Sequence, residues 1–276
     1  LQQFHLGLVR ESLREREILR RIAPHLVNLN RFYIPVYPDT RTRPWQLRIG
    51  LSLYALLGGL KRSQRFSQLP APEWRTLHGL RTDNLQTVFQ YVDGQTDDEL
   101  LTQAVVASAS QLGAIVACPV TFRSATATGN GFEARLCHGG GETTVHCQVL
   151  INAAGPWSDE IAGRISPTPR HPPLALIQGS HLVLDKQLSS ECFYLESPAD
   201  GRAVFVLPWR GQTLLGTTES PFTGDPASVS CSPDEESYLL ATLAHYFPEY
   251  AASARALETT AGLRVLPGGD GSVHGR

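Results

Sequence analysis

The chain has 276 residues, of which 42% are hydrophobic and 18% are charged, and its formal net charge at pH 7 is −2. This length and composition are typical of a globular protein with one large domain or two small ones. The nearly balanced charge argues against a nucleic-acid partner, because such proteins usually carry a clearly basic surface.

The first 85 residues predict an N-terminal helix followed by a basic insertion. Residues 1–25 have apolar side chains at helical spacing, and Glu11 with Arg14 and Glu17 with Arg20 form three-residue charge pairs on the polar side. Residues 26–85 are rich in proline and arginine and predict connections around one helix near residues 45–58.

The insertion is locally basic, since only one acid, Asp39, lies between its first and last arginines. Its cations are Arg31, Arg41, Arg43, Arg48, Lys61, Arg62 and Arg65. Two interpretations remain open, a buried helix with solvated arginines or a segment that rests on an anionic membrane surface. The uncharged stretch 49–60 is too short to span a bilayer.

From residue 86 the pattern changes to alternating strands and helices. A strand is expected through Tyr91, and Asp97 is a good N-cap for a helix over residues 98–112. Five short strands are then expected, near residues 114–117, 120–124, 132–137, 143–146 and 148–152. A helix over residues 157–165 follows them.

The segment 149–159, Val-Leu-Ile-Asn-Ala-Ala-Gly-Pro-Trp-Ser-Asp, is the most informative stretch of the chain. Its aliphatic run is typical of a buried strand, and Pro156 suits a first helical position. The small residues Ala153, Ala154 and Gly155 would let a ligand approach the main chain. The residues alone leave two interpretations open, a nucleotide-binding turn or an ordinary connection between strand and helix.

The last third predicts an antiparallel sheet and one well-capped helix. After the proline-rich residues 167–173, strands are expected near residues 176–184, 203–207 and 213–216. Ser232, Pro233 and two acids predict a helix start, because they supply a capping oxygen, a fixed φ and charge that favours the N-terminal dipole. A final strand is expected over residues 260–265.

The five cysteines are odd in number and show no Cys-x-x-Cys spacing, so they predict reduced, mostly buried thiols. Cys137, His138, His146 and Cys147 could suggest zinc. Neighbouring residues on a strand point to opposite faces, however, so each pair would offer only one ligand. A hairpin around the glycine turn at residues 139–141 is the preferred interpretation, and no metal is expected.

Several ordered stretches resemble FAD-dependent oxidoreductases related to D-amino-acid oxidase and, within them, the quinone-linked glycerol-3-phosphate dehydrogenases. These are residues 8–17, 23–26, 43–51, 149–159, 178–183, 201–209 and 215–219. The resemblance covers nearly the whole chain. The Gly-x-Gly-x-x-Gly turn with which that family begins is not found, and the chain has no methionine, so the sequence is expected to be an internal piece of a longer protein.

The resemblance implies a mixed α/β (α+β) fold, with part of an FAD/NAD(P)-binding Rossmann-like domain and an antiparallel substrate-binding sheet. Residues 1–25 would be a helix of the FAD domain and residues 26–85 an insertion. Residues 86–166 would continue the FAD domain, residues 167–265 would form the substrate-binding domain, and residues 266–276 would begin the return to the FAD domain.

The resemblance also assigns site residues. The expected FAD contacts are Val120, Ala153, Ala154, Gly155 and Trp157. The expected substrate contacts are Thr217, Thr218, Arg264 and Arg276, and the expected catalytic residues are His181 and Arg264. An arginine fork suits a phosphate and a histidine suits a general base. From the residues alone, Arg264 could equally be a surface ion pair and His181 a core histidine. Many relatives have proline directly after the arginine, whereas here Val265 stands there and proline comes at 267.

The implied reaction is FAD-dependent oxidation of sn-glycerol 3-phosphate to dihydroxyacetone phosphate, with electrons passed to quinone. The alternatives are a glycerol-3-phosphate oxidase, an amino-acid or sarcosine oxidase of the same superfamily, or an inactive fragment without cofactor. An anionic membrane surface and a homodimer are left open as partners. The expected location is the cytoplasm, with the inner face of the cytoplasmic membrane as the alternative.

Overall fold

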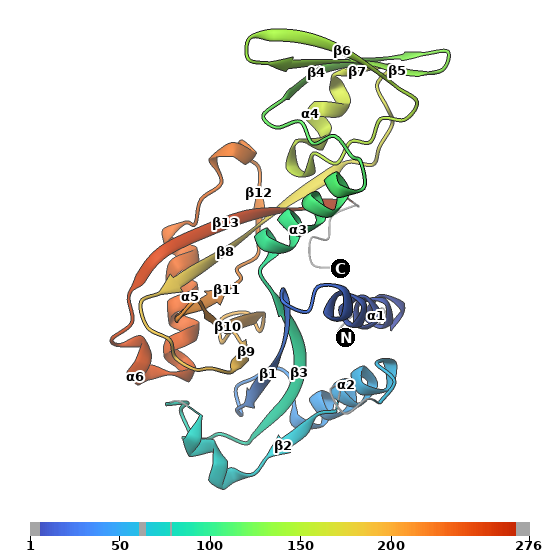
Figure 1. The fold of residues 1–276 in the computed structure, drawn as a ribbon. Helices are drawn as coiled ribbons and strands as arrows, with labels where there is room; N and C mark the ends of the chain where they lie inside the picture. Colours follow the sequence, from blue (N-terminus) through green and yellow to red (C-terminus); the bar gives the residue numbers. More distant parts are fainter. Residues whose placement is uncertain (1–5, 61–64, 78, 269–276) are drawn as a thin grey trace. The chain divides into compact units, whose positions relative to one another are not determined.

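Figure 1 shows the computed structural model of the chain, which describes residues 6–60, 65–77 and 79–268. The chain folds into two compact units. Unit 1 contains Leu1–Thr102, Gly179–Thr218 and Ser230–Ala261, and unit 2 contains Gln103–Gln178, Glu219–Val229 and Gly262–Arg276. Both units combine strands with helices, which confirms the predicted mixed α/β class.

Unit 1 is built on a sheet with the strand order β8-β11-β10-β9-β1-β3-β2. The strands are β1 (Val27–Val36), β2 (Ser67–Leu69), β3 (Thr87–Thr96), β8 (Leu174–Leu184), β9 (Cys192–Glu196), β10 (Ala203–Trp209) and β11 (Gln212–Gly216). All neighbours pair antiparallel except β1 and β9, which are parallel. The antiparallel sheet predicted for the last third of the chain is therefore present, and β8 contributes its residues from Gly179 onward to this unit.

The prediction for residues 26–85 was wrong because it missed two strands, the short β2 and the long β1. β1 pairs with β3 over ten residues, from Val27 opposite Thr96 to Val36 opposite Thr87. Arg31 and Pro35 made the segment look like a connection. Their neighbours Phe32, Tyr33 and Ile34 are all buried, so tertiary packing overrides the local signal.

Both faces of this sheet are covered. Tyr33 and Val88 pack with α5 (Pro233–Tyr246) in the larger core, whereas Ile34 and Phe89 pack with α2 (Pro44–Leu57). Adjacent residues on a strand point to opposite faces, so α5 and α2 lie on opposite sides of the sheet. The short helices η2 (Ala71–Thr76) and α6 (Pro248–Ala251) complete the unit.

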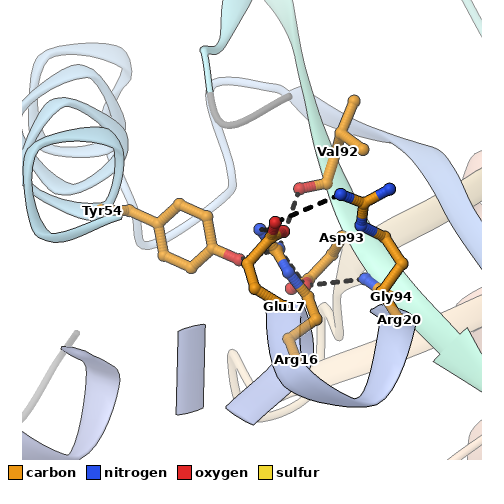
Figure 2. A network of polar contacts seen from close by, with 7 residues as sticks. All are labelled: Arg16, Glu17, Arg20, Tyr54, Val92, Asp93 and Gly94. Carbon is orange, nitrogen blue, oxygen red and sulfur yellow. Dashed lines mark hydrogen bonds and ion pairs between the residues drawn. The ribbon is translucent and has the colours of Figure 1, made fainter. Parts of the chain in front are cut away.

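The N-terminal helix α1 (Leu6–Ile22) is held by a buried arginine, Arg16, which lies one turn after the buried Leu13 and which the sequence analysis did not single out (Figure 2). Arg16 is only 8% exposed, and it donates hydrogen bonds to Asp93 Oδ1 of β3 at 2.7 Å and to the Tyr54 hydroxyl of α2 at 3.0 Å. Asp93 also accepts from the Gly94 amide at 2.8 Å. The Glu17–Arg20 pair is present as predicted, at 3.4 Å.

Unit 2 contains a second sheet with the order β6-β5-β4-β7. Its strands are β4 (Thr121–Thr128), β5 (Gly131–His138), β6 (Gly141–Cys147) and β7 (Ile165–Ser166). The helix α3 (Asp98–Gln111) precedes it, and Asp97 caps that helix as predicted by accepting from the Leu100 amide at 3.2 Å. The turn η3 (Gly155–Trp157) leads into α4 (Ser158–Gly163), which packs against the apolar residues of the sheet through Ile161. Ala162 of α4 is also buried.

Two further strands and one short helix complete the described fold. β12 (Ser220–Phe222) pairs with β8 over Leu176–Gln178, and β13 (Ala256–Pro267) also pairs with β8. The short 3-10 helix η4 is Pro226–Ser228. The final strand predicted over residues 260–265 is therefore confirmed and is longer than expected.

Two predicted strands do not form. Residues 114–117 and 148–152 have no strand structure, and Ile115, Val149 and Ile151 are 95%, 71% and 80% exposed. A strand needs a partner for its backbone groups, and no described strand pairs with either segment. The prediction of mostly buried thiols was also wrong, because Cys192 alone is buried while Cys118 is exposed and the other three are intermediate.

Candidate cofactor and substrate site

The Gly-Pro-Trp turn in unit 2 is shaped by the side chain of Asn152. Its Oδ1 accepts from the Ala154 amide at 3.2 Å, and its Nδ2 donates to the Ser158 carbonyl at 2.9 Å. Ser158 Oγ donates to the Gly155 carbonyl at 2.7 Å. Gly155 has φ +54°, a conformation that favours glycine, so the sequence of this turn is closely matched to its backbone.

The surroundings of this turn leave the main chain accessible, as the predicted FAD contacts require. Ala153 is exposed, Ala154 and Gly155 are half-buried, and a Cβ added to Gly155 would meet no atom within 4 Å. Small side chains beside an accessible main chain leave room for a ligand to reach backbone groups. Trp157 is 42% exposed and offers an aromatic edge next to the same turn.

Val120, the other predicted FAD contact, directly precedes β4 and is half-buried. The main chain before it is held by His138, whose Nδ1 lies 2.7 Å from the Pro119 carbonyl oxygen. A cavity of about 360 Å³ in the same unit is lined by Pro156, Asp159 and residues of β8 and β12. The turn therefore borders this cavity of unit 2.

The predicted base, His181, lies in unit 1 where β11 ends beside the middle of β8. His181 is paired with Gly216 across the two strands, and a Cβ on Gly216 would collide with the imidazole ring. A Cβ on Gly179 would lie 2.6 Å from Thr217 Oγ1. Both glycines therefore allow a side chain, the ring of His181 or the hydroxyl of Thr217, to lie directly against the neighbouring backbone.

Burial lowers the pKa of His181, and the charge of Asp98 opposes that shift without reversing it. The imidazole is consequently neutral at pH 7, which is the form that can accept a proton. This environment is compatible with the predicted role as a base.

Thr218 differs from the other predicted contacts, because its hydroxyl faces α5. It is 4% exposed, donates to Glu235 Oε1 at 2.6 Å and accepts from the Ser180 amide at 2.8 Å. Ser180 Oγ donates to the other carboxylate oxygen of Glu235 at 3.0 Å. Sequence reasoning missed this contact of Glu235, although Ser232 and Glu235 have the spacing of a capping box.

Arg264 lies on β13 in unit 2, with its side chain 56% exposed and its Nη2 atom 3.7 Å from Glu219 Oε1. This is the surface ion pair that the sequence left open as an alternative. A long, exposed pair contributes little stability, so the guanidinium can turn to a stronger anion at little cost. Arg276, the second predicted substrate arginine, lies outside the described residues.

A larger cavity, of about 770 Å³, lies within unit 1 between α2 and the strands β1, β3 and β9. Apolar side chains such as Ile34, Leu47 and Leu51 line it together with the rings of Tyr91 and Tyr194. Burial raises the pKa of both phenols, so they are neutral. This cavity suits an uncharged, largely apolar molecule.

Among the residues that the structure describes, no three His, Cys, Asp or Glu side chains gather closely enough to hold a metal ion. The predicted hairpin is formed by β5 and β6. Its register places His138 opposite Gly141 and Phe132 opposite Cys147. The two His/Cys pairs therefore lie at opposite ends of the hairpin.

Comparison with known proteins adds an independent finding. Residues 2–276 match the family described as "FAD dependent oxidoreductase". A glycerol-3-phosphate dehydrogenase from Pseudomonas aeruginosa is 34% identical, over 96% of this chain and 51% of that protein. A D-erythritol 1-phosphate dehydrogenase from Brucella abortus is 30% identical, over 96% of this chain and 53% of that protein.

One solved structure is also similar to almost the whole chain. The X-ray structure of the glycerol-3-phosphate dehydrogenase from Bacillus halodurans, complexed with FAD, matches with a TM-score of 0.73 and 25% identity. The match covers 96% of this chain and 48% of that one. The chain thus spans about half the length of the curated relatives it matches.

Proposed function

Because the chain belongs to the FAD-dependent oxidoreductase family, we propose that the protein containing it oxidises glycerol 3-phosphate to dihydroxyacetone phosphate. The observation that carries this proposal is the similarity to glycerol-3-phosphate dehydrogenases along almost the whole chain. A neutral, half-buried histidine and an exposed arginine supply the two kinds of group that the reaction needs.

Each group has a role in this proposal. The Arg264 guanidinium binds the substrate phosphate by charge-assisted hydrogen bonds and exchanges its long contact with Glu219 for them. His181 takes the proton of the hydroxyl group at C2 on an imidazole nitrogen. Thr217, whose hydroxyl lies against Gly179 of β8, supplies a further hydroxyl group. FAD, when bound, supplies the acceptor for the hydride from C2, and residues 152–157 would hold it.

The visible absorption spectrum tests the cofactor and the substrate together. The full-length protein that contains this chain is purified, and its spectrum is recorded anaerobically before and after addition of glycerol 3-phosphate. Bleaching of the flavin band is expected. A flavin band that stays unchanged with glycerol 3-phosphate but bleaches with an amino acid would overturn the proposed substrate.

A second substrate is favoured by one specific observation, the 30% identity to a D-erythritol 1-phosphate dehydrogenase. Both compounds are phosphorylated polyols and differ in chain length. D-erythritol 1-phosphate is therefore the comparison substrate in the same experiment. Faster bleaching with the four-carbon compound would assign the protein to the longer polyol.

We further propose that electrons pass to a quinone and that α2 rests on an anionic membrane surface. Trp45, Ile49 and Leu56 are 63%, 60% and 59% exposed and recur at helical spacing along α2. Arg43 directly precedes the helix and Arg48 lies between Trp45 and Ile49, and both arginines are exposed. An exposed apolar stripe with adjacent arginines is typical of helices that lie in a lipid interface. No described helix is both long and apolar enough to cross a membrane.

Cosedimentation with lipid vesicles tests the membrane contact. The protein is expected to bind vesicles that contain anionic phosphatidylglycerol, and to bind less at high salt because the arginine contribution is screened. Replacing Trp45 and Ile49 together by serine is expected to reduce binding about tenfold or more, since each apolar side chain contributes roughly 1.5–3 kcal/mol. Unchanged binding of the double variant would exclude α2 as the contact.

A further inference from the structure

A buried carboxylate links the start of α5 to two strands of the unit 1 sheet. Glu235 is 7% exposed and receives hydrogen bonds from Thr218 Oγ1 at 2.6 Å, Ser180 Oγ at 3.0 Å and the Ser232 amide at 3.0 Å. Its own amide donates to Ser232 Oγ at 3.2 Å. One side chain thus serves both as the capping partner of the helix and as the acceptor for two side chains of the sheet.

The partners of Glu235 are the direct chain neighbours of the proposed site residues. Ser180 precedes His181 on β8, and Thr218 follows Thr217 after β11. Successive side chains on a strand point to opposite faces, so the hydroxyl of Ser180 faces α5 while the ring of His181 lies on the other face of the sheet. The backbone closes the same link, because the Thr218 amide donates to the Ser180 carbonyl at 3.2 Å.

The packing around His181 tolerates little displacement of the two segments that this link joins. The imidazole lies directly over Gly216, and Thr217 Oγ1 lies directly over Gly179. A small shift of β11 against β8 would therefore move both side chains. The link to Glu235 is buried throughout, since Ser180 is 0% and Thr218 is 4% exposed. Buried hydrogen bonds to a carboxylate are strong and directional, so they are suited to fixing such a register.

The place of Glu235 at the start of α5 is suited to a buried negative charge. The helix has 14 residues, and its N-terminal amides and dipole favour an anion in the first turn. The two hydroxyls and the Ser232 amide supply donors for both carboxylate oxygens.

From this arrangement we infer that Glu235 is a positioning residue for the site proposed above, acting through Ser180 and Thr218 on His181 and Thr217. The inference rests on the proposed function for its kinetic consequence. Its structural content, that Glu235 holds the place of His181, is independent of the substrate.

The test compares Glu235→Ala and Glu235→Gln with the control Asp234→Asn in the full-length protein. Asp234 is the neighbouring residue in the same helical turn and is exposed, so its replacement removes a charge near the same dipole without touching the sheet. Glu235→Ala is expected to lower kcat with glycerol 3-phosphate roughly ten- to hundredfold, because small misplacements of a reacting group have effects of this size. KM is expected to change less than kcat, because phosphate binding is assigned to Arg264.

Glu235→Gln and the control Asp234→Asn complete the kinetic comparison. Glu235→Gln keeps one carbonyl oxygen as acceptor and is expected to give an intermediate loss. Asp234→Asn is expected to stay within about twofold of the parent. The flavin absorption of all variants is expected to match that of the parent, which separates displacement of His181 from loss of cofactor.

A second readout separates failure of this inference from failure of the proposed function. The titration of the His181 ring is followed by NMR, with a His181→Gln variant used to assign its signal. In Glu235→Ala the pKa of His181 is expected to rise toward its ordinary value of about 6.5, because a loosened sheet end admits water. If the parent does not turn over glycerol 3-phosphate, the proposed function fails while this titration still decides the role of Glu235.

The outcome that overturns the inference is an unchanged His181 titration together with a kcat within twofold of the parent in a folded Glu235→Ala protein. Ser180→Ala serves if Glu235→Ala does not fold, because it removes one hydroxyl and leaves the helix cap intact. It is expected to shift the His181 titration in the same direction by a smaller amount, and no shift would count against the inference.

Discussion

At the scale of single residues, two glycines, Gly179 and Gly216, allow side chains to lie against the backbone where β11 ends beside the middle of β8. One acid, Glu235, accepts hydrogen bonds from Ser180 and Thr218 next to them. Gly216 is the more demanding of the glycines, because a Cβ there would collide with the His181 ring and lie 2.9 Å from the Ser180 carbonyl oxygen. A side chain at this position must therefore displace the imidazole or the strand.

We expect Gly216→Ala to lower the free energy of unfolding by about 1–3 kcal/mol, the usual cost of overpacking a buried position. Turnover should fall as well, since His181 has to move. Urea unfolding and steady-state kinetics measure the two effects. Gly7→Ala is the control, because a Cβ at that exposed helical position meets nothing within 4 Å. A Gly216→Ala protein as stable as the parent would show that the strands have room to separate.

Arg264 gives a second prediction at this scale. Arg264→Ala removes the guanidinium proposed to bind the substrate phosphate and should raise KM roughly ten- to hundredfold, as expected for hydrogen bonds between charged groups worth about 1.5–3 kcal/mol. The flavin spectrum should not change. Glu219→Gln removes the competing partner of Arg264 and is expected to leave KM equal or lower. An unchanged KM in Arg264→Ala would remove this residue from the site.

Which residues could be predicted from the sequence depended on how far apart the interacting partners lie in the chain. Asp97 as a helix cap and the Ser232–Glu235 capping box follow from three-residue spacings. The contact of Glu235 with Ser180 joins residues 55 positions apart and leaves no local signal. Thr218 could be recognised as part of a motif, but only the structure shows its hydroxyl turned toward α5.

At the scale of elements, the attachment of α1 depends on a polar contact rather than on an apolar face. Leu13 is its only buried apolar side chain among residues 6–22, and Arg16 is the other buried residue. The guanidinium connects three elements, since Asp93 belongs to β3 and Tyr54 to α2 (Figure 2).

Replacing Arg16 by methionine should therefore destabilise the protein by about 1.5–3 kcal/mol, because the Asp93 carboxylate loses a hydrogen-bonded cation. Chemical denaturation measures the difference. Arg20→Met is the matched control. Arg20 is 50% exposed and contacts Glu17 at 3.4 Å, and the loss of such a surface pair should cost no more than about 0.5 kcal/mol. Equal effects of the two substitutions would contradict the proposed attachment.

Elements with local patterns were predicted well, and elements that depend on partners were not. The hairpin of β5 and β6 has alternation and a glycine turn, and it forms where expected. β1 was missed because Pro35 and Arg31 mask a strand whose stability comes from β3 and β9. Residues 148–152 have the composition of a strand but pair with no described strand, so composition alone was misleading.

At the scale of the whole molecule, two histidines of unit 1 link stability to pH. Burial lowers the pKa of His181 and of His245, and Arg81, whose Nη2 lies 3.0 Å from His245 Nε2, lowers the pKa of His245 further. Asp39 at 3.3 Å opposes this shift. The unfolded chain therefore binds more protons than the native protein below an ordinary histidine pKa of about 6.5.

The sign of the pH effect follows from that difference. The stabilisation is fully present above pH about 6.5 and is lost as the pH falls through this value toward the lowered pKa values of the native state. The urea concentration at half-unfolding is thus expected to fall between about pH 7.5 and 5.5. His245→Gln should show a smaller fall. The same fall in the variant and in the parent would show that His245 does not contribute.

The order of motifs along the chain was enough to predict the family and the fold class. Which parts of the chain form each unit could not be predicted from the sequence, because each unit is assembled from three separate stretches of chain. Unit 1, for example, joins β1 and β3 to β9 through a parallel pair, and nothing in the residues of β1 specifies that partner.

The exposed aliphatic side chains of unit 2 have a practical consequence for handling the isolated chain. The side chains of Ile115, Val149 and Ile151 expose large apolar surfaces to water. They lie on segments without regular structure. A polypeptide with these 276 residues should therefore enhance the fluorescence of the dye ANS and be retained on phenyl resin while natively folded. Low protein concentration and mild detergent are then the conditions under which it stays dispersed.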